Sequence, residues 1–187
     1  MLFRSSGAAH TGDLALGCAM GCNSGQIKCG EDGDCTIDCN GGNAESGACR
    51  SMVVTGGREN DPMKVFCAGM LSPCFGSSFT GPLTGSLVVD CQGTEASCGN
   101  RTLHNPGSAS CSITSGSADA LNHAKLFLGS AGGALDCIGS SACRSLVVGP
   151  DSGVFGVLDI NCHRVQACAG NQFNYPVKYV HSLRKED

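Results

Sequence analysis

The chain has 187 residues, of which 15 are cysteine and 28 are glycine, and it carries 15% charged residues, a formal net charge of −4 and no tryptophan. The charge excludes the strongly basic surface that nucleic-acid binding requires, and a hydrophobic content of 41% excludes wholesale disorder. This cysteine content is typical of disulfide scaffolds in oxidising compartments.

The chain divides into an N-terminal extension (residues 1–17), a cysteine-rich region (18–173) and a C-terminal tail or cap (174–187). The extension lacks the apolar core of a signal peptide. We therefore expect that a leader has been removed or that the chain is a fragment of a longer precursor. No apolar run approaches the ~20 residues of a membrane-spanning helix, so we expect no membrane span.

A short phrase recurs along the cysteine-rich region. It consists of an apolar residue, any residue, a cysteine, a polar loop, a second cysteine and a further apolar segment. Residues 48–54 and 142–148 are two copies of its second half, and they differ only by methionine for leucine. The copies begin at Ile37, Val65, Val89, Leu135 and Ile160.

The leading cysteines of this phrase are spaced by about 25 residues, a period that indicates a repeat architecture. This spacing counts Cys111 as the leading cysteine of a degenerate copy. The apolar segments are short, β-branched and alternating, and Gly/Ser/Asn/Pro turns separate them. The pattern predicts an all-β fold, a right-handed parallel β-helix of six or seven rungs. The alternative is a β-sandwich, and residues 118–128 are the one helix candidate.

The phrase resembles the Cys-rich repeats, roughly I-x-C-x-G-x-x-A-C, of large secreted and surface proteins of algae and other protists. In architecture it is similar to the pectate-lyase-like β-helix class. The resemblance implies a solenoid fold and is weak evidence for function.

Pairing within each phrase is the simplest disulfide hypothesis, and bridges between adjacent rungs are the alternative. Pairing within each phrase leaves Cys111 without a partner, and this residue is then either free and buried or bound to a partner chain. Zinc binding is the other use of many cysteines, but the chain has no Cys-x-x-Cys. The predicted pairs are Cys18–Cys22, Cys29–Cys35, Cys39–Cys49, Cys67–Cys74, Cys91–Cys98, Cys137–Cys143 and Cys162–Cys168.

A column of acids is the main candidate for catalysis. Asp38, Asp90 and Asp136, with Asn161, each precede a leading cysteine, so rungs in register stack them on one outer face. Paired carboxylates on such a face can act as acid and base on a polysaccharide. The favoured interpretation is a solvated polar face whose side chains bond to turn backbone.

Three smaller features have structural explanations beside the functional ones. Glu31, Asp32 and Asp34 offer oxygen ligands for Ca²⁺ but lack EF-hand spacing, so an exposed acidic turn is favoured. Asn100 begins a glycosylation sequon. His163 and Arg164 suggest catalysis, but neighbouring strand residues point to opposite faces.

From these observations we expect a non-catalytic, disulfide-stabilised solenoid in a secreted, surface or lumenal assembly, bound to other subunits or to copies of itself. The alternative is a polysaccharide-active β-helix lyase or hydrolase that uses the Asp column. We expect no cofactor and no nucleic-acid partner.

Overall fold

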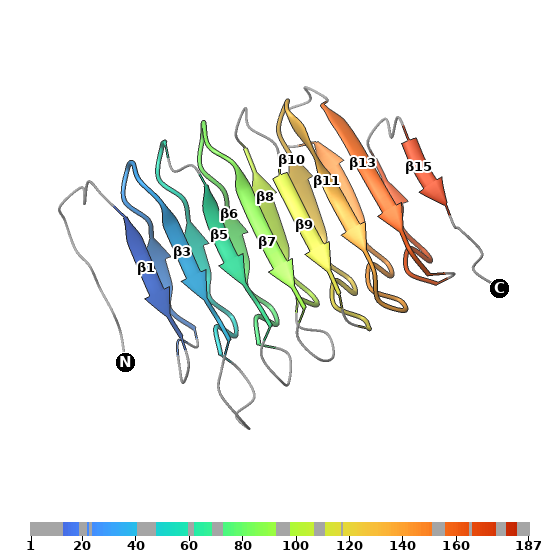
Figure 1. Cartoon of the computed structure of the whole chain (residues 1–187), viewed down its shortest axis with the longest axis horizontal. Coiled ribbons are helices and arrows are strands. Elements are labelled where there is room, and N and C mark those ends of the chain that lie inside the picture. The colour runs from blue at the N-terminus through green and yellow to red at the C-terminus, as the bar shows by residue number, and fades with distance from the viewer. Residues whose placement is uncertain are drawn as a thin grey trace.

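The computed structural model describes residues 13–18, 22, 24–40, 48–59, 62–68, 73–92, 98–106, 111–116, 118–150, 156–164, 166–174 and 179–182, with the backbone alone at 111 and 179–182. Within these residues every regular element is a β-strand. The strands form two parallel sheets, and the chain alternates between them. Figure 1 shows the odd-numbered strands, from β1 to β15, side by side in chain order, with the sheet of even-numbered strands behind them.

The first sheet has eight strands in the described residues, and the second has seven. The eight-stranded sheet consists of β1 (Leu14–Gly17), β3 (Cys35–Asp38), β5 (Met63–Phe66), β7 (Leu87–Cys91), β9 (Cys111–Ser115), β11 (Gly132–Cys137), β13 (Val157–Cys162) and β15 (Tyr179–Ser182). The seven-stranded sheet consists of β2 (Gln26–Lys28), β4 (Val53–Thr55), β6 (Ser78–Thr80), β8 (Thr102–Asn105), β10 (Lys125–Leu128), β12 (Val147–Pro150) and β14 (Gln172–Phe173).

This arrangement confirms the predicted β-solenoid. Seven successive strand pairs of the described chain, β1–β2 to β13–β14, form seven coils, and β15 adds one strand to the larger sheet. The winding is right-handed (Figure 1), as is nearly always the case for parallel crossovers. Strands β1 and β15 lie outside the predicted bounds of 18–173, so the solenoid is longer than the cysteine pattern indicates.

Two columns of apolar side chains fill the interior, one from each sheet. Strand alternation places every second residue inside, and the parallel register stacks equivalent residues of successive coils. All of these side chains are at most 1% exposed. The column of the eight-stranded sheet is Ile37, Val65, Val89, Ile113, Leu135 and Ile160, and that of the seven-stranded sheet is Val54, Phe79, Leu103, Leu126 and Val148.

In each coil one turn leads from a strand of the eight-stranded sheet into the next strand of the seven-stranded sheet. We call this turn the disulfide corner. It contains a residue with left-handed backbone conformation in every coil. Its N–H donates to a carbonyl of the following coil in six coils, over 2.8–3.2 Å. Serine, asparagine and histidine adopt this conformation as well as glycine, although it costs them roughly 1–2 kcal/mol. The residues are Ser24, Ser51, Gly76, Asn100, His123, Ser145 and Gly170, with φ between 49° and 70°.

The expected helix at residues 118–128 is wrong. Residues 118–123 form the disulfide corner of one coil, and β10 follows at Lys125–Leu128. Asp119 and His123 have φ values of 56° and 57°, which a right-handed helix does not accommodate.

Candidate functional site

Seven disulfides join described cysteines, and they are the same seven pairs that pairing within each phrase predicts. Six of them lie at the disulfide corner. Cys29–Cys35 instead closes the opposite turn, from β2 into β3. The disulfides indicate an oxidising, extracellular or lumenal environment.

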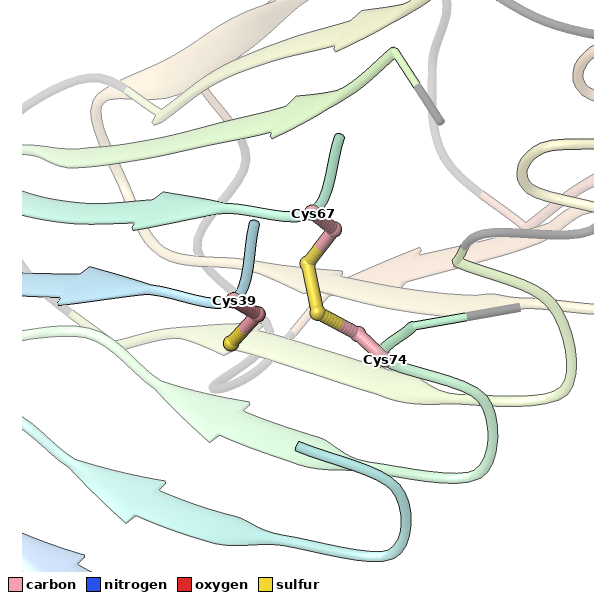
Figure 2. Close-up of side chains that lie close together, drawn as sticks. All are labelled: Cys39, Cys67 and Cys74. Atoms are coloured by element: carbon pink, nitrogen blue, oxygen red, sulfur yellow. A yellow bond between two sulfur atoms is a disulfide. The ribbon is translucent and has the colours of Figure 1, made fainter. Parts of the chain in front are cut away.

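Sulfur atoms of neighbouring coils lie close together along the disulfide corner. The Sγ atoms of Cys39, Cys67 and Cys74 all lie within 4.8 Å of one another, and Figure 2 shows Cys39 beside the Cys67–Cys74 disulfide of the next coil. Cys137, Cys162 and Cys168 form a second such group. These are the only described groups that place three potential metal ligands so close. Since their sulfurs are bonded as disulfides, they present no thiolate to a metal.

The coil between the Cys91–Cys98 and Cys137–Cys143 disulfides has no disulfide at its corner. Ser115 of β9 is the register partner of both Cys91 and Cys137, so it occupies the first cysteine position. Cys111 pairs instead with Leu87 and Gly133, four residues earlier in the register. The assignment of Cys111 as a leading cysteine is therefore wrong. Its predicted free or intermolecular thiol lies outside the described side chains.

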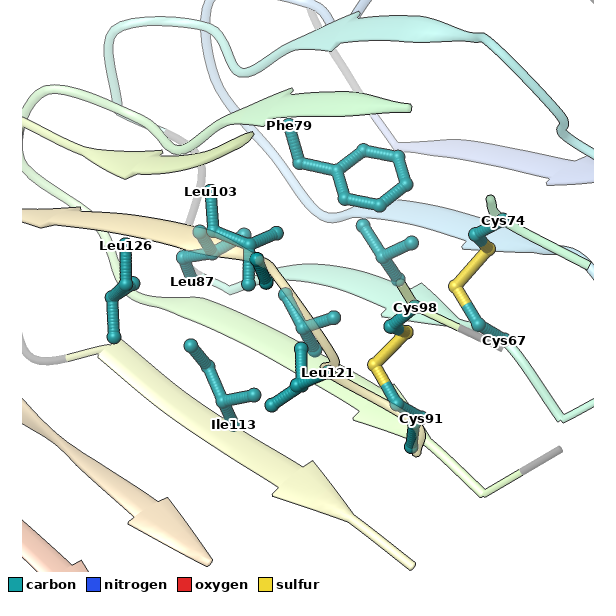
Figure 3. Packing of buried hydrophobic residues seen from close by; sticks show 14 of the residues in the cluster. Cys67, Cys74, Phe79, Leu87, Cys91, Cys98, Leu103, Ile113, Leu121 and Leu126 are labelled. Atoms are coloured by element: carbon teal, nitrogen blue, oxygen red, sulfur yellow. A yellow bond between two sulfur atoms is a disulfide. The ribbon is translucent and has the colours of Figure 1, made fainter. Parts of the chain in front are cut away.

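Leu121 takes the place of the second cysteine in this coil. The Cys98 N–H donates to Ala120 O, and the Leu121 N–H donates to Ala142 O, which places Leu121 between Cys98 and Cys143. Leu121 is fully buried, and Figure 3 shows it beside the Cys91–Cys98 disulfide. The Ser115 hydroxyl is also buried and donates to Ala142 O at 3.2 Å. An apolar contact and a hydrogen bond thus replace the covalent bond.

The predicted acidic column is in register but interrupted. Asp38, Asp90 and Asp136 lie in one outer column, and Phe66 and Thr114 occupy the strands between them. Successive acids are therefore two strands apart, about 9–10 Å between backbones. No two of these carboxylates are neighbours.

Hydrogen bonds of the first two acids are local and structural. Asp38 accepts the Asn40 N–H at 2.9 Å, and Asp90 accepts a hydrogen bond from the Gln92 amide at 3.2 Å. Partial burial raises the pKa of Asp90, and the Gln92 hydrogen bond opposes this rise. The Asp38 contact agrees with the interpretation of a polar face that bonds to turn backbone, whereas Asp90 bonds to a side chain.

Asp136 has a different partner. Its Oδ1 lies 2.6 Å from Nε2 of His163, which belongs to the next coil. Both side chains are about half exposed. Sequence reasoning missed this pair because it considered only neighbours along one strand, whereas the contact joins residues of adjacent coils.

A buried arginine is the second feature that the sequence did not reveal. Arg101 is 2% exposed and lies inside the disulfide corner. Its guanidinium donates to Cys74 O of the preceding coil, its Nη1 lies 3.9 Å from Cys67 Sγ, and its Cζ lies 4.9 Å from the centre of the Phe79 ring. Burial lowers the pKa of Arg101 to about 9. The arginine thereby ties two coils together.

The remaining predicted positions lie on the surface. Glu31 pairs with Lys28 at 3.0 Å, which lowers the pKa of Glu31, and the Asp34 N–H donates to Asp13. Glu31, Asp32 and Asp34 do not form one of the described groups of close metal ligands. Asn100 is exposed at the disulfide corner, so its amide is accessible.

Within the described residues there is no helix with the length and hydropathy needed to cross a membrane. No family model, curated protein or solved structure matches the chain.

Proposed function

We propose that this chain is a non-catalytic, disulfide-stabilised solenoid that presents a rigid surface to protein partners in a secreted, surface or lumenal assembly. The partners are other subunits or copies of the chain itself. The resemblance of its repeats to those of protist secreted and surface proteins supports the same role.

The observation that carries this proposal is an uncharged face on the seven-stranded sheet. Register pairing stacks the outward residues of β4, β6 and β8, and none of them is Asp, Glu, Lys or Arg. Val53 in this face is 42% exposed although it is apolar. Protein interfaces are depleted of charge at their centres, and a disulfide-linked sheet loses little entropy when it binds. The face consists of Val53, Thr55, Ser78, Thr80, Thr102 and His104.

The interrupted column of acids gives less support to the polysaccharide-active alternative. Most glycosidases place two carboxyl groups about 5–9.5 Å apart around the scissile bond, and the two-strand separation of these acids lies at or beyond the upper end of that range. The strands that carry Phe66 and Thr114 separate Asp90 from the other two acids.

Two measurements test the proposal. Sedimentation of the chain at increasing concentration, with Val53→Glu as the variant and Lys64→Glu on the opposite sheet as the control, measures self-association through the uncharged face. We expect the first substitution to weaken association and the second to leave it unchanged. A screen for turnover of acidic polysaccharides tests the alternative, and turnover that disappears in both Asp90→Ala and Asp136→Ala would overturn the proposal.

A further inference from the structure

One cysteine at each end of the disulfide corner is more exposed than the cysteines in the middle. Cys22 in the first coil and Cys168 in the last are only partly buried. Among the described cysteines of the disulfide corner, Cys22 and Cys168 are therefore the most accessible to an external thiol. The eight cysteines between these end disulfides are fully buried: Cys39, Cys49, Cys67, Cys74, Cys91, Cys98, Cys137 and Cys143.

The two end disulfides also differ in charge. The Cys162–Cys168 loop contains one exposed cation, Arg164, whereas His163 of the same loop is paired with the Asp136 carboxylate. The loop closed by Cys18–Cys22 has the sequence Ala-Met-Gly and no charged residue. Nearby cations stabilise a cysteine thiolate and so make that cysteine a better leaving group. This contrast favours opening of the C-terminal disulfide.

The last disulfide lies against the disulfide of the preceding coil. Sγ of Cys137 is within 4.8 Å of Sγ of both Cys162 and Cys168. Cys137 and Cys162 are register partners on adjacent parallel strands, so their Cα atoms are about 4.8 Å apart, inside the range of 4.4–6.8 Å that a disulfide requires. A bond between these coils needs side-chain rotation and little backbone movement.

We propose that Cys162–Cys168 is a redox-active site for external dithiols and that it exchanges with the Cys137–Cys143 disulfide. This activity is independent of the proposed assembly role.

The reaction proceeds through successive thiolate attacks. A thiolate of the dithiol attacks Cys168 Sγ and forms a mixed disulfide, and Cys162 leaves as a thiolate. The second thiol of the reagent then attacks the reagent sulfur that is bonded to Cys168. The bond to Cys168 breaks, Cys168 is released as a thiol, and the reagent leaves as its intramolecular disulfide.

The Cys162 thiolate next attacks Cys137 Sγ. The Cys137–Cys143 bond breaks, a Cys137–Cys162 bond forms, and Cys143 leaves as a thiolate that takes a proton. In total the dithiol loses two electrons and two protons, and the protein gains thiols at Cys143 and Cys168. The exchange ends at this coil because Ser115 and Leu121 supply no sulfur to continue it.

The experiment uses the full chain with its pre-existing thiols blocked by iodoacetamide. An equimolar amount of dithiothreitol is added, the reaction is quenched with acid, new thiols are labelled with N-ethylmaleimide, and peptides are mapped without reduction. We expect labels at Cys143 and Cys168 and a peptide linked through Cys137 and Cys162. Labels at Cys162 and Cys168 with Cys137–Cys143 intact would refute the exchange. First labelling at any other disulfide would refute the site.

A surface variant tests the role of charge without disturbing the core. Arg164→Gln removes the cation inside the reactive loop, and Arg58→Gln removes an exposed cation at the opposite turn, between β4 and β5. We expect the first to slow dithiol consumption by a factor of about three or more and the second to leave the rate unchanged. Equal rates in the two variants would refute the contribution of Arg164.

Discussion

The coil that contains Cys137–Cys143 and the coil that contains Ser115 and Leu121 have the same corner, although only one has a disulfide. Six positions separate the two corner residues in both. Each has a fully buried alanine before the second corner residue, Ala142 or Ala120. Each also has a left-handed residue two positions after it, bonded to the next coil.

The comparison shows that backbone turns and small buried side chains determine the shape of the disulfide corner. The disulfide constrains a geometry that also forms without it. On the chain-entropy view, its contribution is mainly to restrict the unfolded chain. The two coils therefore provide matched sites for separating covalent from packing contributions to stability.

Removing the covalent bond should have the largest effect. We expect the Cys137→Ala/Cys143→Ala pair to lower the free energy of unfolding by about 2–4 kcal/mol. Cys137→Ser/Cys143→Leu copies the coil without a disulfide, and it should lose less because leucine fills the space and serine can donate to Ala167 O. Guanidinium unfolding followed by circular dichroism measures both. Equal losses would contradict the equivalence of the two corners.

The reverse exchange should stabilise the other coil. Ser115→Cys/Leu121→Cys closes a loop of the same length as Cys137–Cys143, and such a loop contributes about 2 kcal/mol on the chain-entropy model. The control is Ser115→Ala/Leu121→Ala, which removes the serine hydroxyl and most of the leucine side chain without adding a bond. We expect the cysteine pair to unfold at higher denaturant than the alanine pair, with mass spectrometry confirming the bond. A lower midpoint would show that the corner geometry is not suited to a disulfide.

The left-handed residues should give a smaller effect. Glycine relieves the strain of a positive φ but adds backbone freedom to the unfolded chain. We therefore expect Ser145→Gly and His123→Gly each to raise the free energy of unfolding by up to about 1 kcal/mol, and Ser145→Val to lower it. Similar increases in the free energy of unfolding for the two glycine variants would support the equivalence of the two turns. An increase for only one of them would contradict this equivalence.

The smallest expected effect is the pH dependence of stability that arises from Asp90. This residue lies on the outer face beside Thr114 of the coil without a disulfide. Partial burial raises the pKa of Asp90 above that of the unfolded chain. The folded protein thus binds this proton more tightly, and the associated stability is present in acid and lost as pH rises through the folded pKa. We expect the melting temperature of Asp90→Asn to lack this small decline. A steeper decline in the variant would contradict the direction of the shift.

The solenoid could be predicted from the sequence because the same corner turn and the same buried apolar positions recur from coil to coil. The prediction failed where cysteine was used as the only marker of register. Cys111 is the nearest cysteine to the expected position, but Ile113 continues the buried column between Val89 and Leu135. Burial of apolar side chains, rather than the cysteines, determines the register.

The candidate chemistry was predictable only in part. The phrase placed Asp38, Asp90 and Asp136 in one column, and the intervening Phe66 is visible when the copies are aligned. The Asp136–His163 pair and the placement of Arg101 arise from contacts between coils, at sequence separations of 27 and 34 residues. Such contacts cannot be derived from the pattern within one repeat.

The left-handed residues that recur at the disulfide corner affect how this protein can evolve. In the described residues each strand pairs with the strands of the coils before and after it, and the turn residue is serine, glycine, asparagine or histidine. An inserted copy of one coil would thus add one strand to each sheet and meet compatible neighbours on both sides. Duplication of a short gene segment can lengthen this protein without remodelling the rest of its interior.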